Sequence, residues 1–285
     1  VPPASITRRM ARARRMPDFR RSRDAGWNSL LLLAFVSGAV LRAWQIDIQI
    51  LIDDEWHAVH RLLRFAPVDI FTHVGYADYS IPLTLYYQWL YRTIGLSEWG
   101  MHVPPLVAGV GLLLIGPRIL MRRFALPTRA VWTALAAISP LLVYHSRVAR
   151  PYALTCLLTF VAIFAFRAWR QDGRQRDAAL YVGATVLAGW LHTVALAFVL
   201  LPFVHGALQA LRPFDRRAVL RLVKLGIATA LPLALLLLPP PVDAPPSPPL
   251  APSPPLAARV EGQRREGRQE SPLSLPPGSG IREGR

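Results

Sequence analysis

Residues 27–41 read WNSLLLLAFVSGAVL, an almost continuous apolar run that ends just before Arg42 and Trp44. Residues 1–26, ahead of this run, carry eight arginines against two aspartates. A basic segment before an apolar core is typical of a first transmembrane helix and also of a signal peptide. Because no clear small-residue cleavage site follows, we interpret 27–41 as an uncleaved span and 1–26 as a basic, solvated cytoplasmic arm. A cleaved signal peptide is the alternative.

Further apolar segments recur along the chain up to residue 238. They cover residues 103–120, 130–144, 153–166, 178–191 and 193–211, with a shorter seventh at 225–238. Several are shorter than the roughly 20 residues that cross a bilayer, so polar flanks must complete the crossing. The 53% content of hydrophobic residues excludes disorder over most of the 285 residues. The sequence therefore predicts an all-α, multi-pass transmembrane helical bundle of about seven spans over residues 27–238.

The formal net charge of +16 first suggests a nucleic-acid partner. However, the basic residues gather in alternate connections, at 122–129, 167–176 and 212–224, on the same side as the basic N-terminal arm. The positive-inside rule assigns that side to the cytoplasm. We therefore expect a plasma (inner) membrane protein with a cytoplasmic N-terminus and membrane lipids around it, and no nucleic-acid partner. Only the 1–26 arm leaves nucleic-acid binding open.

The remaining connections then lie on the extracytoplasmic side. The longest, residues 45–101, has helical apolar spacing over 53–65 and a second apolar, aromatic stretch over 82–96. We interpret 82–96 as an interfacial helix, because a crossing there would turn the downstream basic loops outward. The sequence thus predicts a structured first extracytoplasmic loop.

Two further features of the sequence are the composition of the C-terminal tail and the cysteine content. Residues 239–285 are rich in proline and then in Arg, Glu, Gly and Gln, which predicts a polyproline-like, disordered tail. This tail is a linker or sequence that follows a truncation; a proline-motif ligand for a partner is the alternative. Cys156 is the single cysteine, so an intramolecular disulfide and a cysteine-based metal site are both excluded.

The first candidate site is the acidic run Asp53, Asp54 and Glu55, followed by His57, just beyond the first span. A helix dipole keeps carboxylates at a helix start ionised. Such a group can accept a proton from a hydroxyl or bind a divalent cation, which here would be Mg or Mn held by Asp54 and Glu55. The alternative is a simple N-terminal helix cap that faces water.

The second and third candidate clusters lie on the same side. Two arginines in a short extracytoplasmic connection run against the topological bias, and their guanidinium groups match phosphate oxygens. Contact with lipid headgroups is the alternative reading for them. His192 lies in a tight turn on that side, where it is either a site residue or an interfacial one. The second cluster consists of His145, Ser146, Arg147, Arg150 and Tyr152.

Carboxylates, paired arginines and a histidine at the outer membrane boundary suit a reaction in which a lipid-linked phosphate leaves a sugar. The sequence also resembles a known family. The ordered segments are LIDDEWH (51–57), YSIPLTLYYQWLYRTIGLSEWG (79–100), SPLLVYHSRVARPYALTCLL (139–158) and LHTVAL (191–196). Together they resemble GT-C glycosyltransferases, and more narrowly the bacterial protein-mannosyltransferase-like and aminoarabinose-transferase-like branch. The resemblance covers roughly residues 27 to 211.

The resemblance implies a GT-C fold and transfer of a sugar from a polyprenyl-phosphate donor to a hydroxyl on a lipid, glycan or protein acceptor. It implies that Asp54 is the catalytic base, with Glu55 beside it. The family's tyrosine-serine-arginine-tyrosine pattern maps onto Tyr144 or His145, then Ser146, Arg150 and Tyr152. His192 matches a histidine in a later outer turn of the family.

This chain also departs from the family. Arg147 and Val148 stand where relatives usually have Gln-Glu, and relatives continue through further spans. The alternative function is therefore a truncated, non-catalytic membrane protein of the same fold that binds a lipid-linked glycan or a partner. A transporter is a weaker alternative, because the centres of the predicted spans are mostly free of charge.

Overall fold

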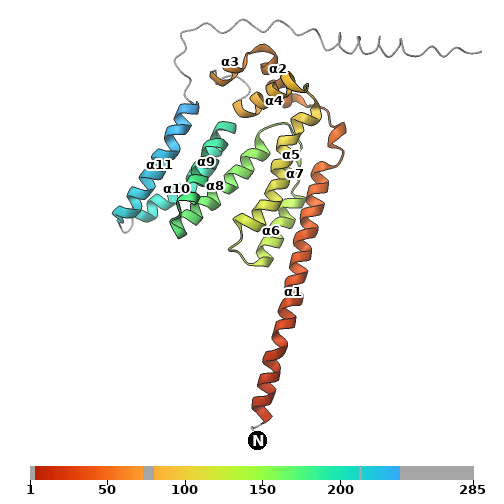
Figure 1. The fold of residues 1–285 in the computed structure, drawn as a ribbon, viewed down its shortest axis with the longest axis vertical. Coiled ribbons are helices and arrows are strands. Elements are labelled where there is room, and N and C mark those ends of the chain that lie inside the picture. Colours follow the sequence, from red (N-terminus) through yellow and green to blue (C-terminus); the bar gives the residue numbers. More distant parts are fainter. Residues whose placement is uncertain (1–3, 73–79, 212–213, 238–285) are drawn as a thin grey trace, which may run out of the picture. The chain divides into compact units, whose positions relative to one another are not determined.

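The computed structural model describes residues 4–72, 80–211 and 214–237, with side chains from residue 24 onward except those of 53, 71 and 72. The proline-rich tail predicted for residues 239–285 lies outside the described residues. Within the described ranges every regular element is a helix, and the only strand-like pairing is one isolated bridge between Leu211 and Phe214. The fold is thus all-α, as the sequence predicts (Figure 1).

Most described residues of the predicted apolar segments lie in helices; Ser139, Thr193 and Val194 do not. Four helices are long and apolar enough to cross a membrane, at Asp24–Ile48, Glu98–Leu120, Tyr152–Asp172 and Arg216–Leu237. Two of the other predicted spans form helices of 17 residues, α9 (Gln175–Leu191) and α10 (Ala195–Leu211). The chain is therefore described as a membrane protein with four helices of spanning length and shorter apolar helices between them.

The first helix, α1 (Ala4–Ala43), begins well before the apolar run. Residues 4–26 continue it as helix, so the solvated arm expected from the charge has a regular backbone from Ala4. Ala, Arg and Met, which are frequent in this stretch, have high helix propensity. The apolar part of α1 packs against α5 (Glu98–Ile115) and α6 (Leu126–Ile138).

The predicted third span is broken in two, between α6 and α7 (Pro140–His145). Pro140 has no N–H, so the carbonyl of Ala136 loses its normal helical donor. Arg42 at the end of α1 replaces that donor: its two terminal nitrogens donate to the carbonyls of Ala136 and Ala137 at 2.9 and 3.1 Å. The break is therefore stabilised by a buried arginine from another helix.

Helices α8 (Tyr152–Asp172), α9, α10 and α11 (Arg216–Leu237) share a second apolar core. Its buried aromatic residues include Phe166, Trp169 and Tyr181. The outward faces of α10 and α11 carry apolar side chains that are more than half exposed. A lipid environment explains such faces, because water would oppose them. They are Phe198, Leu201, Val204 and Leu208 of α10 and Ile227, Leu231 and Leu235 of α11.

The described residues of the long connection between α1 and α5 form short helices. It contains η1 (Ile46–Ile48), η2 (Asp53–Glu55), α2 (Trp56–Arg64), α3 (Pro67–Thr72) and α4 (Ile81–Thr93). The predicted helices at 53–65 and 82–96 correspond to η2 with α2 and to α4. These elements bury an apolar core of their own that also includes Met101 of α5, Ala149 and Leu191.

Helix α4 is joined to the start of α5 by two tyrosines. Pro104 and Pro105 of α5 lack N–H groups, which leaves the carbonyls of Gly100 and Met101 without helical donors. The hydroxyl of Tyr86 donates to Gly100 at 3.1 Å, and that of Tyr87 lies 3.3 Å from Met101. The Tyr86 hydrogen bond, which Pro104 makes possible, therefore ties α4 to a helix of membrane-spanning length.

Candidate active site

Glu55 of the predicted acidic run is held on several sides. It is fully buried, and its Oε2 accepts a hydrogen bond from the backbone N–H of Ile52 at 2.7 Å. Its Oε1 accepts another from the backbone N–H of Ala149, in the connection between α7 and α8. The first and second candidate clusters are thus in direct contact through one carboxylate.

His102 of α5 completes the surroundings of Glu55. Its Nε2 lies 3.2 Å from Oε1 of Glu55, and both side chains are fully buried. Its Nδ1 lies 2.7 Å from the carbonyl oxygen of Glu98, so Nδ1 must carry the hydrogen. A neutral imidazole would then present a lone pair to the carboxylate. One further proton must therefore lie between His102 and Glu55.

Burial raises the pKa of Glu55, but hydrogen bonds from His102 and from the N–H groups of Ile52 and Ala149 outweigh that effect. The net result is a pKa below the ordinary value of 4.5. Glu55 is therefore ionised at neutral pH, and we assign the shared proton to Nε2 of His102. The pair is a buried ion pair whose remaining oxygen is satisfied by backbone donors.

Ala149 is held from both sides of its backbone. Its N–H donates to Glu55, and its carbonyl accepts a hydrogen bond from the hydroxyl of Tyr87 at 2.9 Å. Ala149 and Tyr87 are both fully buried. The connection that carries Arg147 and Arg150 is therefore fixed against α4 and the acidic run.

Arg150 follows this fixed residue and points to the acidic run. Its Nη1 donates to the carbonyl oxygen of Asp54 at 3.2 Å, and its guanidinium lies 5.9 Å from the ring centroid of Tyr152. The side chain of Asp54 is 61% exposed, with Oδ1 at 3.8 Å from Nε2 of His57. The backbone of Asp54, whose carboxylate is accessible, is thus hydrogen-bonded to the guanidinium of Arg150.

Three of the predicted aromatic residues form a chain of ring contacts. His145 lies edge-on to Tyr152 with ring centroids 4.8 Å apart, and Tyr152 lies 5.7 Å from His192 at the end of α9. Burial lowers the pKa of His145, so its imidazole is neutral at neutral pH. Within the described ranges its buried Nδ1 has no hydrogen-bond partner.

Ser146 and Arg147 occupy different surroundings from their neighbours. Ser146 is buried, donates to the carbonyl of Leu142 at 2.5 Å and accepts from Nε of Arg42 at 3.2 Å. Arg147 exchanges hydrogen bonds with Gln49, donating to its side-chain oxygen at 3.1 Å and accepting from its side-chain nitrogen at 2.9 Å. Ser146 therefore supports the α1–α7 contact, while Arg147 ties this connection to the segment after α1.

The acidic run does not provide a ready cation site with its described atoms. Both oxygens of Glu55 are already engaged, and of the two described carboxylates of the run that of Asp54 is the accessible one. No group of three His, Cys, Asp or Glu residues that could hold a metal occurs among the described side chains, which exclude that of Asp53. Glu55 therefore does not fit the role of a direct Mg or Mn ligand, and we derive no step through such an ion.

The sequence prediction missed His102, Tyr87 and the role of Arg42. His102 stands one residue before the predicted span 103–120, on the predicted outer side, and that position was the available signal. Arg42 ends the first apolar run and reads as an interface residue, whereas its side chain is fully buried. Tyr87 is one of several aromatic residues in its helix, and no sequence feature separates it from the others.

Comparison of the chain with protein-family models, with curated proteins and with solved structures finds no match. The functional conclusion therefore depends on the chemistry of the site.

Proposed function

We propose that this protein is a membrane glycosyltransferase of GT-C type. It transfers a sugar from a polyprenyl-phosphate donor to a hydroxyl acceptor at the extracytoplasmic face of the plasma membrane. One observation carries the proposal. Segments far apart in sequence bring an accessible carboxylate, a guanidinium and a histidine–tyrosine cluster to the region where α5 and α8 begin and α9 ends.

Asp54 is the general base in this proposal. Its carboxylate is accessible to an acceptor, whereas Glu55 is enclosed and acts as a positioning residue that fixes the 145–152 connection. Arg150 is held beside Asp54 and supplies positive charge for the donor phosphate. His145, Tyr152 and His192 provide ring faces, N–H groups and a hydroxyl for the sugar or phosphate oxygens.

The reaction is a single displacement at the anomeric carbon. The acceptor oxygen forms a bond to that carbon as its proton passes to Asp54, and the bond to the phosphate oxygen breaks. The polyprenyl phosphate leaves with the electron pair of that bond, and its negative charge is stabilised by Arg150. Because the base activates the acceptor without forming a sugar–enzyme bond, the anomeric configuration inverts.

The purified full chain with a panel of polyprenyl-phosphate sugars provides the test. Asp54→Asn should lower transfer by about 10²–10⁴-fold, which is the usual contribution of a general base. Asp47→Asn is the matched control, because Asp47 is an exposed carboxylate of η1 in the same outer segment. Equal transfer by wild type and Asp54→Asn would contradict the proposal.

The same experiment distinguishes the glycosyltransferase from the non-catalytic alternative. That alternative predicts saturable binding of the donor lipid by the wild-type chain with no product formed from any donor of the panel. Arg150→Gln should weaken donor binding under either function, because a buried guanidinium beside the site is lost.

A further inference from the structure

A pocket of about 420 Å³ lies away from Asp54, at the opposite ends of the helices that carry the candidate site. It is formed by η3 (Gly116–Leu120), a π-helical turn that continues α5, together with α8 and α9. Seventeen residues separate His102 from Ile119, about 26 Å along a helix. That distance is close to the roughly 30 Å thickness of a bilayer core. The pocket therefore lies at the headgroup layer opposite the candidate site.

The lining of this pocket combines positive charge with apolar surface. Four arginines and one aspartate contribute to it. The lining residues that carry no polar side chain are Ile119, Leu120, Phe124, Phe164, Ala165, Ala168 and Leu180. A free nucleotide or an acidic peptide would leave much of this apolar surface uncovered. An anionic headgroup with acyl chains matches both parts.

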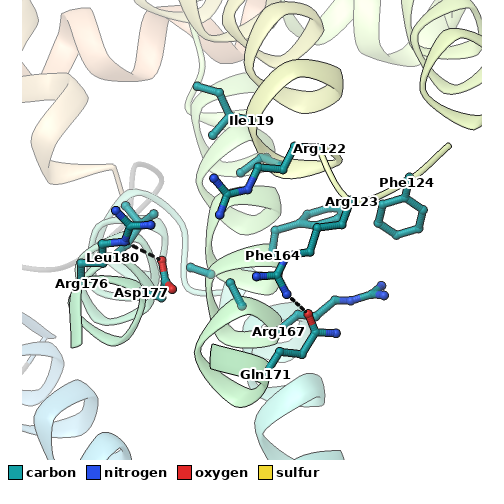
Figure 2. Close-up of a pocket in the computed structure, with 13 residues that line it drawn as sticks. Ile119, Arg122, Arg123, Phe124, Phe164, Arg167, Gln171, Arg176, Asp177 and Leu180 are labelled. Carbon is teal, nitrogen blue, oxygen red and sulfur yellow. Dashed lines mark hydrogen bonds and ion pairs between the residues drawn. The ribbon is translucent and has the colours of Figure 1, made fainter. Parts of the chain in front are cut away.

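The arginines of the pocket differ in how firmly they are engaged. Arg123 donates to Gln171 and pairs with Asp172, and Arg167 stacks 4.9 Å from the ring centroid of Phe124. Arg176 lies 3.8 Å from Asp177. Arg122 projects between these groups in Figure 2, and among the described residues it has no hydrogen bond or ion pair. Arg122 is therefore the guanidinium available to a ligand.

The backbone at the pocket is also unusual. Residues 116–120 form a π-helical turn, a geometry that often occurs at functional sites. The carbonyl of Pro117 in this turn accepts a hydrogen bond from Nε of Arg129 at 2.5 Å. This turn precedes the connection that carries Arg122 and Arg123. A stabilised local distortion thus positions the basic edge of the pocket.

We propose that this pocket binds the headgroup of an anionic phospholipid. The phosphate contacts Arg122 and the neighbouring arginines, and an acyl chain lies along the apolar lining. Basic pockets between membrane helices on the positively charged side suit such lipids. This site is independent of the proposed glycosyl transfer.

Lipid titrations of the purified full chain, followed by native mass spectrometry, test the proposal. Phosphatidylglycerol should bind about tenfold more tightly than phosphatidylcholine. Arg122→Gln should weaken phosphatidylglycerol binding about fivefold and leave phosphatidylcholine binding unchanged. Arg217→Gln, which removes an exposed arginine at the start of α11 outside the pocket, should behave as wild type.

Three outcomes would overturn the proposal. Equal affinity for the two lipids would remove the anionic specificity. Equal losses in Arg122→Gln and Arg217→Gln would show that only overall charge matters. Competition by glycerol 3-phosphate as effective as that of phosphatidylglycerol would identify a soluble-anion site without an acyl-chain contribution. An unchanged melting temperature of Arg122→Gln in phosphatidylcholine shows that the variant is folded.

Discussion

At the scale of single residues, Glu55 connects three parts of the candidate site. It joins the start of α2 to α5 through His102 and to the α7–α8 connection through Ala149. An ionised group with this many partners stabilises the fold only while all of them are present, because a partnerless buried charge is costly. The accessible Asp54 has no comparable structural role.

Replacing Glu55 with Gln should therefore destabilise the protein strongly. The change removes the buried carboxylate that pairs with His102 and accepts from the N–H groups of Ile52 and Ala149, which we expect to cost about 3 kcal/mol. The melting temperature in detergent should fall by about 6–12 °C. Glu98→Gln is the matched control, because Glu98 is an exposed acid in the first turn of α5. A melting temperature of Glu55→Gln within error of the control would refute the buried ion pair.

The lowered pKa of Glu55 also predicts a pH dependence. Its contribution to the free energy of unfolding is fully present above its ordinary pKa of 4.5 and is lost as the pH falls through the lower folded-state value. The stability difference between wild type and Glu55→Gln should therefore shrink in that acidic range. Denaturation of both proteins from neutral pH to pH 3 measures it; a difference that stays constant throughout would count against an ionised Glu55.

For single residues, the sequence predicts which segments form the candidate site but only some of the side-chain contacts between them. Asp54, Arg150 and Tyr152 are predicted site residues, and the structure brings them together. His102 is not predicted, because its pairing with Glu55 joins residues far apart in sequence and has no local pattern. The buried positions of Ser146 and Arg42 likewise depend on how α1 packs against α6 and α7.

At the scale of elements, close packing of α1 against its neighbours depends on Gly38. A Cβ atom at this position would lie 2.6 Å from Cδ1 of Leu113 in α5 and 2.8 Å from Cβ of Ala137 in α6. Only glycine allows these three helices to approach this closely. The contact brings Arg42, one turn further along α1, to the open end of α6.

Gly38→Ala should accordingly destabilise the protein by about 1–3 kcal/mol through overpacking. Gly183→Ala is the control, because a Cβ atom there would meet nothing within 4 Å. The control should be neutral or stabilising by up to about 1 kcal/mol, since alanine has the higher helix propensity. Thermal unfolding of both variants in the same detergent decides; equal effects would mean that α1 does not pack tightly at Gly38.

Apolar runs are sufficient to predict these helices, because a membrane helix needs only length and low charge. The break at Pro140 is foreseeable from the missing N–H, yet its stabilisation by Arg42 is not, because that contact comes from another helix. The extension of α1 back to Ala4 reflects local helix propensity, which the charge-based prediction of a solvated arm did not weigh.

At the scale of the whole molecule, the alternating basic connections predict the orientation in the membrane. A chain with Cys156→Ser as background can carry single cysteines for labelling. Asp47→Cys should react with a membrane-impermeant maleimide on intact cells, whereas Arg174→Cys and Arg217→Cys should react only after lysis. The three positions are exposed, so access to the reagent depends on the side of the membrane. The reverse labelling pattern would invert the topology and move the Asp54 site to the cytoplasm.

Glycoconjugate profiling of intact cells tests the central claim most directly. Cells that lack the gene should lose a sugar modification from one class of envelope glycoconjugate. Wild-type protein should restore that modification, and Asp54→Asn, expressed at the same level, should not restore it. An unchanged profile without the gene, or full restoration by Asp54→Asn, would contradict the assignment of this chain as a glycosyltransferase with Asp54 as its base.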